Sequence, residues 1–165
     1  MKFKDNLKTA GYFNVYLDYH KGKGKELFCT ETFDADECNL IVKAAKQQIL
    51  TSIYMSNITS DPIRTLKIGS GGVIDPAGMF PRLEDPLQED LVTPILSVDA
   101  IYVVDLDNVV VTFLADVDTD QANGSLISEA GLFKDSGQMF NVKNHPGIPK
   151  TPEFSIHYEW RIRVL

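Results

Sequence analysis

Residues 153–165 read EFSIHYEWRIRVL, and this stretch decides the class of fold. Every second side chain in it is apolar, namely Phe154, Ile156, Tyr158, Trp160, Ile162 and Val164. The side chains between them are polar or charged. An alternation with a period of two is typical of a β-strand with one buried and one exposed face. We therefore predict a long C-terminal strand whose apolar face lies in the core.

The same alternation occurs near the beginning of the chain, in residues 12–19. A turn rich in Lys and Gly follows, and residues 26–33 form a second β-rich run, so residues 12–33 are predicted to be a hairpin. Turn residues separate the further β-rich runs, which lie at 63–68, 94–104, 108–115, 126–133 and 139–142.

One stretch has a different period. Its apolar side chains recur at steps of three and four residues, namely Leu40, Ile41, Ala44, Ala45, Ile49 and Ile53. This spacing predicts one amphipathic α-helix over about residues 36–55. Because no strand–helix–strand alternation surrounds it, the helix is expected to pack on an antiparallel β-structure.

The 165 residues have the length of a single domain. About seven or eight predicted strands and one helix indicate a mainly β fold, an antiparallel β-sandwich or a barrel-like domain. Residues 1–10 are predicted to be an extended N-terminal arm, and residues 76–94 a loop rich in Pro and acidic residues.

The charge is negative and unevenly distributed. The net charge is −7, and residues 83–133 contain no Lys or Arg. Eleven acids lie in that region, namely Glu84, Asp85, Glu89, Asp90, Asp99, Asp105, Asp107, Asp116, Asp118, Asp120 and Glu129. Phosphate groups repel a negative chain, so neither nucleic acid nor an anionic membrane is an expected partner.

The sequence also bears on the location of the protein and on the state of its cysteines. The N-terminus lacks the apolar run of a signal peptide, and no apolar run is long enough to span a bilayer, so we expect a soluble protein made in a cytoplasm. Cys29 and Cys38 are too few for a disulfide scaffold or a four-cysteine zinc site. We interpret them as free thiols, with a bridge between them left open.

Two motifs resemble parts of known ligand-binding sites, but each lacks other residues that such a site requires. The Gly-rich residues 69–72 are followed by Val-Ile-Asp-Pro, without the Lys-Ser/Thr pair and helix of a phosphate loop, so a turn is favoured. Asp116, Asp118 and Asp120 resemble the beginning of a calcium loop, but an EF-hand requires Gly and Glu where Gln121 and Ile127 stand. These aspartates stay weak candidates for a different cation site, and a solvated turn is favoured.

No residue pattern indicates catalysis. The three histidines, His20, His145 and His157, are scattered, and none stands in a recognisable nucleophile or metal context. We therefore predict a protein that is not an enzyme, with no catalytic residues and no cofactor.

Three motifs in order carry a resemblance to a known group of proteins. They are SEAGLF at residues 128–133, IPK at 148–150 and EWRI at 159–162. With the preceding hairpin and Gly-rich turn, the chain resembles small virion proteins of tailed bacteriophages, found among tail, collar and fibre-associated genes. Within this signature, Leu132 and Phe133 are expected in the core, and Glu129 is expected to hold a turn by accepting backbone N–H bonds.

The resemblance implies a structural virion component, made in the host cytoplasm and placed in the neck or collar, the baseplate or the fibre-attachment region of the tail. Its expected partners are neighbouring virion proteins and other copies of itself in a symmetric homo-oligomer. An alternative is a receptor- or glycan-binding β-module whose binding is assisted by calcium.

The expected contact residues lie in two places. Apolar side chains in a long loop need cover, which a neighbouring subunit often supplies. This points to Met79, Phe80, Arg82, Leu83 and Leu87. The basic arm, with Lys2, Lys4 and Lys8, is the expected electrostatic partner of the acidic region on another copy.

Overall fold

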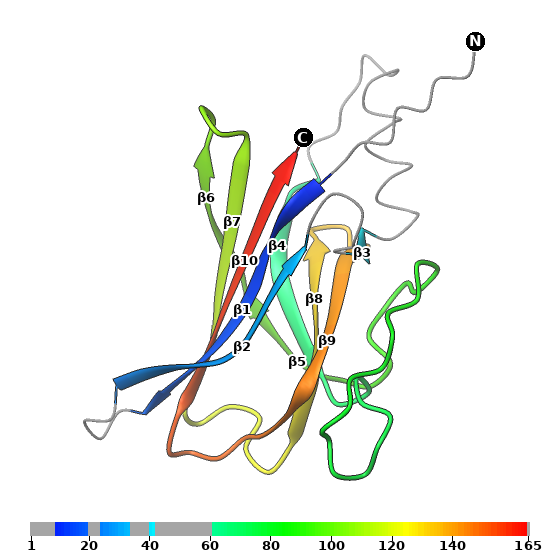
Figure 1. The fold of residues 1–165 in the computed structure, drawn as a ribbon, viewed down its shortest axis with the longest axis vertical. Coiled ribbons are helices and arrows are strands. Elements are labelled where there is room, and N and C mark those ends of the chain that lie inside the picture. The colour runs from blue at the N-terminus through cyan, green and yellow to red at the C-terminus, as the bar shows by residue number, and fades with distance from the viewer. Residues whose placement is uncertain (1–8, 20–23, 34–39, 42–60, 165) are drawn as a thin grey trace.

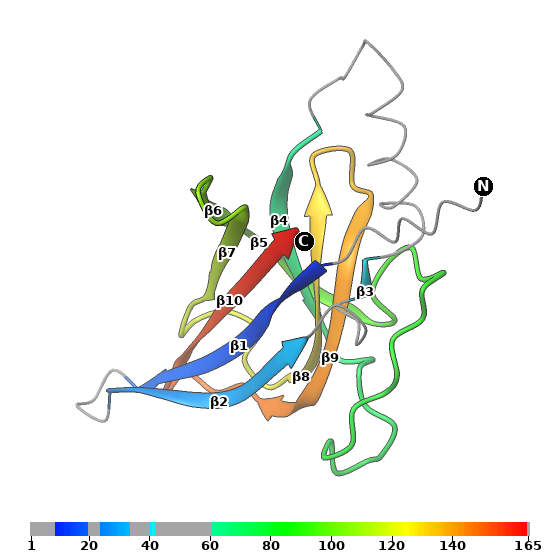
Figure 2. The same ribbon diagram turned by 45° about the horizontal axis from the view of Figure 1, so that its top comes forward.

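The computed structural model describes residues 9–19, 24–33, 40–41 and 61–164, which form two antiparallel sheets (Figure 1). The first sheet has the order β2 (Gly24–Phe33), β1 (Thr9–Tyr19), β10 (Ser155–Val164), β7 (Val110–Val117) and β6 (Ile101–Asp105). The second has the order β3 (Leu40–Ile41), β9 (Met139–Pro149), β8 (Leu126–Lys134), β4 (Ile63–Gly69) and β5 (Pro94–Asp99). Both sheets are open, so the described strands form a sandwich-like arrangement and no closed barrel (Figure 2).

The alternating C-terminal stretch is a strand at the centre of the first sheet, as predicted. β10 pairs with β1 on one side and with β7 on the other. Its inward side chains from Ile156 to Ile162 are buried, as is Phe154 just before the strand, and Trp160 is fully enclosed. The main hydrophobic cluster joins them to Leu66 of β4 and Leu132 of β8. The inner faces of the two sheets therefore share one core.

The predicted hairpin is also present, because β1 and β2 are adjacent antiparallel strands. Cys29 of β2 is a free thiol, and burial raises its pKa to about 12. Cys38 lies outside the described residues, as do most of the predicted helix and the basic residues of the N-terminal arm. The described part of the chain contains no helix. Leu40 and Ile41, predicted to be helical, instead pair with β9 as the short strand β3.

The run at residues 94–104, predicted to be one strand, is two strands in different sheets. β5 ends at Asp99, opposite Thr65 of β4. The N–H of Ala100 still donates to the Arg64 carbonyl at 2.8 Å, and Ile101 then pairs with Leu114 of the first sheet. The prediction of a single strand was wrong because no Gly or Pro separates the two strands, so the sequence does not show where the chain changes sheets.

The second sheet contains a Pro in a place where the sequence predicts a loop. β9 continues to Pro149, although only residues 139–142 were predicted as strand. The register with β8 shifts between Ile127 and Glu129, which leaves His145, Pro146 and Gly147 without partners on β8. A bulge tolerates Pro within a strand because no ladder hydrogen bond is required there.

The bulge places His145 in the core, where it is fully buried. Its Nδ1 lies 2.8 Å from the Pro146 carbonyl oxygen. Because a carbonyl only accepts, Nδ1 carries the proton, and Nε2 is left to face the Tyr158 hydroxyl at 3.5 Å. Burial lowers the pKa of His145 to about 4, although the Pro146 carbonyl acts in the opposite direction.

This buried imidazole makes the folded state sensitive to acid. Between pH 6.5 and about 4, the unfolded chain protonates His145 and the folded chain does not. The free energy of unfolding therefore falls as the pH falls through this range, with a contribution of about 3 kcal/mol once pH 4 is reached. Urea unfolding at pH 7 and at pH 4.5 measures this fall in the free energy of unfolding. We expect the fall between the two pH values to be smaller for His145→Gln than for the wild type. Equal losses in the two proteins would contradict this role, since their carboxyl groups are the same.

Candidate interaction surfaces and the contacts that position them

One carboxyl group fixes the long connection between β4 and β5, residues 70–93, which we call the 70–93 segment. Glu129 of β8 is completely buried. Its oxygens accept hydrogen bonds from the backbone N–H of Gly71 at 2.8 Å, Val92 at 3.0 Å and Thr93 at 2.8 Å. Gly71 lies at the beginning of the segment, and Val92 and Thr93 lie at its end. The Glu129 side chain therefore ties both ends of the segment to β8, as the sequence predicts for a turn-holding acid.

The glycines at residues 69–72 make this contact possible. Gly69 lies opposite Glu129 in the β4–β8 register, and a Cβ on Gly69 would come within 2.5 Å of the Glu129 carboxyl. A Cβ on Gly72 would lie 2.0 Å from the Ser128 carbonyl oxygen. Because no side chain fits between these backbones, the Gly-rich stretch is a place of close approach as well as the predicted turn.

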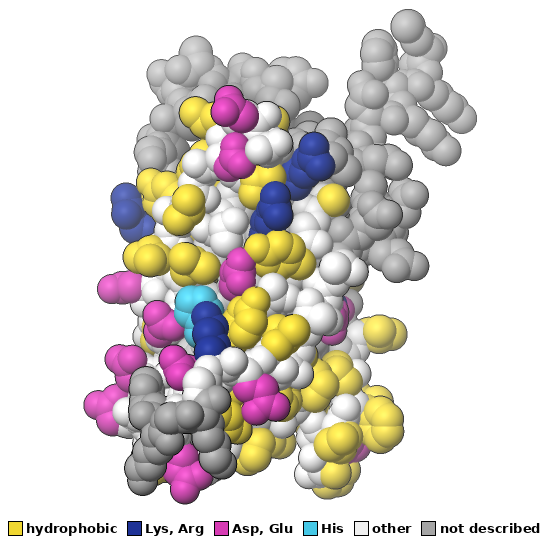
Figure 3. Space-filling view, turned by 60° about the vertical axis from the view of Figure 1, so that its left-hand side comes forward, with side chains coloured by type: hydrophobic (Ala, Val, Ile, Leu, Met, Phe, Trp, Pro, Cys, Tyr) yellow, Lys and Arg dark blue, Asp and Glu magenta, His cyan; other side chains and the backbone are white. Residues whose placement is uncertain are grey.

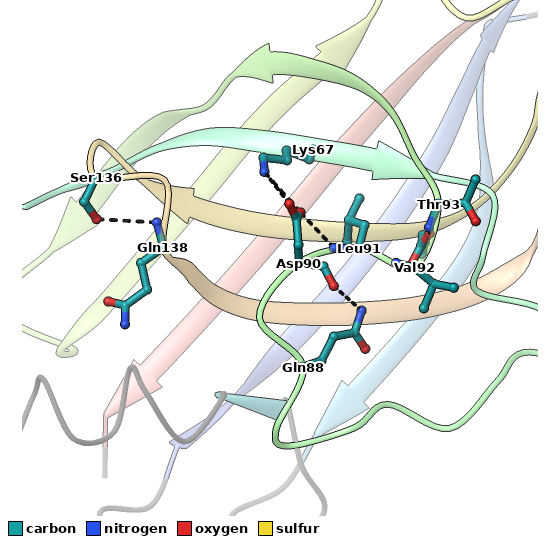
Figure 4. Close-up of polar contacts among 9 residues, drawn as sticks. Lys67, Gln88, Asp90, Leu91, Val92, Thr93, Ser136 and Gln138 are labelled. Carbon is teal, nitrogen blue, oxygen red and sulfur yellow. Dashed lines mark hydrogen bonds and ion pairs between the residues drawn. The ribbon is translucent and has the colours of Figure 1, made fainter.

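The segment also builds a small second core on the outer face of the second sheet. Leu91 packs in a cluster with Phe133, Met139 and Val142. Figure 4 shows the neighbouring ion pair, in which Lys67 of β4 lies 3.1 Å from an oxygen of Asp90. As a result β8 is buried on both faces, and Glu129 lies beneath the segment.

The middle of the segment is attached to β9. Glu84 accepts the backbone N–H of Asn144 at 2.9 Å. Lys143 forms ion pairs with both Glu84 and Glu31 of β2. Burial acts to lower the pKa of Lys143, but these two carboxyl groups outweigh it and raise the pKa above its ordinary value. The acidic residues of the segment therefore hold it in place.

Of the predicted contact residues, Arg82 belongs to this framework. Its backbone N–H donates to the Gly72 carbonyl at 2.7 Å, and its Nε donates to the Gly71 carbonyl at 3.1 Å. The side-chain amide of Asn144 donates to the backbone carbonyl of Arg82 at 2.8 Å. Arg82 thus stabilises the segment internally, and its contact with a partner stays a prediction.

The apolar contact residues are exposed. They are Met79, Phe80, Leu83 and Leu87, and we call them the segment patch. Leu83 is 90% exposed, so within the described part of the chain nothing covers it. The predicted electrostatic partners of the acidic region, Lys2, Lys4 and Lys8, lie outside the described residues.

A second apolar surface, which the sequence reasoning missed, lies on β6 and the turn after it. Residues 101–109 are all exposed, and we call them the β6 edge surface. Side chains 101–104, Ile-Tyr-Val-Val, are 49–64% exposed although they belong to a strand. Val109 ends the turn with φ of 55°, in the left-handed region that a β-branched residue rarely adopts. Figure 3 brings the β6 side of the molecule forward and shows hydrophobic side chains spread over it with acidic side chains between them.

The β6 edge surface continues a row of aromatic core residues. Phe13, Trp160, Phe113 and Tyr102 are register partners across β1, β10, β7 and β6. The Phe13 and Trp160 rings lie 4.7 Å apart, and the Phe113 and Tyr102 rings 6.4 Å apart. Phe13 and Trp160 are fully buried, whereas Tyr102 is 51% exposed. The inner face of the sheet therefore extends beyond the part that the second sheet covers.

The acidic turn after β7 shows a different arrangement. Asp116 lies 2.6 Å from Nδ1 of His157, and the Asp118 N–H donates to the Gln121 side chain. The ammonium of the buried Lys150 donates to Asn123 Oδ1 at 3.1 Å and to the Thr151 carbonyl at 2.9 Å. Among the described residues, no three His, Cys, Asp or Glu side chains are grouped to hold a metal ion. Asp116, Asp118 and Asp120 are thus not brought together as ligands.

No family model, curated protein or solved structure matches this chain. The class that the structure itself defines is an all-β protein of two open antiparallel sheets, in its described residues. In the part of the chain that the structure describes, no helix has the length and hydrophobicity needed to cross a membrane.

The Glu129 contact leads to a stability prediction. Glu129→Ala leaves three backbone N–H groups without their acceptor, so we expect the free energy of unfolding to fall by about 3 kcal/mol or more. Urea denaturation measures the loss, and limited proteolysis measures whether cleavage moves into the 70–93 segment. The matched control is Glu89→Ala, an exposed acid of the same segment, which we expect to unfold like the wild type. Equal stability of the two variants would contradict the role of Glu129.

The acidic turn leads to a second prediction. Because Lys150 already donates to oxygens in and beside this turn, we expect millimolar Ca²⁺ to leave the thermal unfolding midpoint unchanged. Lys150→Met should lower the free energy of unfolding by about 1 kcal/mol, since the oxygens of Asn123 and Thr151 lose their charged donor. A calcium-dependent rise of the midpoint that Asp118→Ala abolishes would contradict this and restore the cation site.

Proposed function

We propose that the protein is a non-enzymatic structural component of a tailed-phage particle and acts through contacts between subunits. The observation that carries the proposal is the β6 edge surface, a run of nine exposed residues that includes Ile101, Tyr102, Val103 and Val104. Apolar surface of this kind on an otherwise well-packed protein marks an interaction site. The partners are other copies of the chain and neighbouring virion proteins.

Two further observations support this proposal. The segment patch is a second exposed apolar surface, and it lies on a connection held by Glu129 and Glu84, so it is presented on a fixed support. The sequence motifs SEAGLF, IPK and EWRI resemble those of small virion proteins from the tail, collar and fibre-associated group. We propose a position in the neck or collar, the baseplate or the fibre-attachment region, the three stations that the resemblance implies.

The alternative, a receptor- or glycan-binding module aided by calcium, has less support. It draws on the acids at 116, 118 and 120, which the structure does not group as metal ligands. It also leaves the exposed Ile101, Val103 and Val104 of β6 without a role, because branched aliphatic side chains offer no hydrogen-bond partner to a polar sugar. Binding on a glycan array that Asp118→Ala abolishes would favour this alternative.

The composition of purified virions tests the proposal. We expect quantitative mass spectrometry to find the chain in the particles in several copies, and electron microscopy to place it in the tail or neck. A protein that is absent from purified virions would contradict the proposal.

A variant tests whether the segment patch takes part. In phage that lack the gene and receive it in trans, Leu83→Glu with Leu87→Glu should reduce incorporation several-fold, because charges replace apolar contacts. Glu89→Gln on the same segment is the control and should be incorporated normally. Equal incorporation of both variants would exclude the segment patch from the contact.

A further inference from the structure

The outer strands of the described sheets differ in how their free edges are protected. β2, at one edge of the first sheet, carries Lys25, Glu26 and Glu31. β5, at an edge of the second sheet, begins with Pro94. Charged residues and Pro are the usual means by which edge strands avoid pairing with another chain. β6 has neither over residues 101–104, and its two faces are both exposed.

We propose that β6 pairs antiparallel with β6 of a second copy, about a two-fold axis that passes through Val103. This inference rests on the proposed function, since it names one partner and one geometry for the subunit contact. It joins the two first sheets into one continuous sheet of the order β2-β1-β10-β7-β6 followed by its mirror order in the second copy.

The register follows from which face each side chain occupies. Tyr102 and Val104 pair with Phe113 and Val111 of β7 and so lie on the inner face. Ile101 and Val103 pair with Leu114 and Thr112 and lie on the outer face. Opposed residues of an antiparallel pair share a face, so the axis must pass through a residue.

An axis at Val103 uses the whole strand. Val103 then faces Val103 of the second copy, and Tyr102 faces Val104. Asp105 faces Ile101, so no two acids within β6 are directly opposed. An axis at Tyr102 would pair only residues 101–103 of the two strands and would leave Val104 and Asp105 outside the β6 ladder.

The choice of a second copy follows from the pattern of β6 itself. A strand that pairs with β6 must offer apolar side chains on both faces at its centre, without charge. Among the described edge strands, β2 is charged, β5 begins with Pro94 and β3 has only two residues, so β6 is the one that offers this pattern over four consecutive residues. Pairing of two β6 strands also covers Tyr102, the exposed end of the aromatic row.

Charge gives the contact a recognisable salt dependence. The chain has a net charge of −7, and three aspartates lie close to the apolar residues 101–104: Asp99 before β6, Asp105 at its end and Asp107 in the turn after it. Two copies therefore repel one another at long range while their apolar strands attract at contact. Added salt screens the repulsion, so self-association should become stronger as the salt concentration rises. A basic partner would show the opposite dependence.

The experiment compares two edge substitutions in the full chain. Sedimentation equilibrium across a range of protein and salt concentrations measures the dimer dissociation constant. We expect Val103→Lys to raise it roughly tenfold or more, because two lysines then meet at the axis in place of two valines. Leu27→Lys is the matched control, an exposed apolar residue on the opposite edge of the same sheet, and it should change nothing. Both positions are exposed in the monomer, so circular dichroism should show both variants folded.

Cross-linking tests the register directly. Antiparallel partners have their Cα atoms about 4.5–5.5 Å apart, which a disulfide bridges. Val103→Cys should therefore form a covalent dimer on mild oxidation, and Leu27→Cys should not. The wild-type chain is oxidised alongside to measure any contribution from Cys29 and Cys38.

Three results would overturn the inference. They are a wild type that stays monomeric at every concentration, a dimer indifferent to Val103→Lys, and a dimer abolished by Leu27→Lys. The last result would indicate head-to-tail pairing of β6 with β2. Each of them leaves the proposed function intact if the chain is found in virions, whereas absence from virions with a normal β6 dimer would overturn the proposed function alone.

Discussion

The buried carboxyl group of Glu129 is the contact on which the second half of the structure depends. Three backbone N–H groups, from Gly71, Val92 and Thr93, converge on it from the two ends of the 70–93 segment. A buried carboxyl group that lacked such partners would be strongly destabilising, so the side chain and the segment require one another. With the segment in place, Leu91 completes the small outer core against Phe133, and β8 is enclosed on both faces.

The structure shows that the acids of residues 83–133 do not form one cluster. The acids of this region are separated in the structure, and several of them accept hydrogen bonds from backbone N–H groups or pair with a lysine. Glu129 and Glu84 fix the long segment, Asp90 pairs with Lys67, and Asp105 closes the β6–β7 turn with Asn108. These acids therefore stabilise connections within the chain.

Sequence patterns predict the parts of this fold that have one buried and one exposed face. The strict alternation of residues 153–165 gives β10, and the role of Glu129 follows from an acid in a strand beside a Gly-rich turn. The patterns fail where both faces have the same environment. Residues 94–104 contain no Gly or Pro after Pro94, so the sequence does not mark the change of sheet at Ala100. The apolar residues 101–104 likewise do not show that both faces of β6 are exposed. The bulge that admits Pro146 depends on register between strands, which a local pattern does not contain.

The central claim is that the 70–93 segment is fixed within the monomer while β6 is completed by a second copy. Hydrogen–deuterium exchange measured at several protein concentrations tests both halves at once. The account predicts slow exchange for the amides of Gly71, Val92 and Thr93 at every concentration. It also predicts protection of residues 101–105 that increases with protein concentration and with salt. Rapid exchange in the 70–93 segment, or exchange of β6 that is the same at all concentrations, would contradict it.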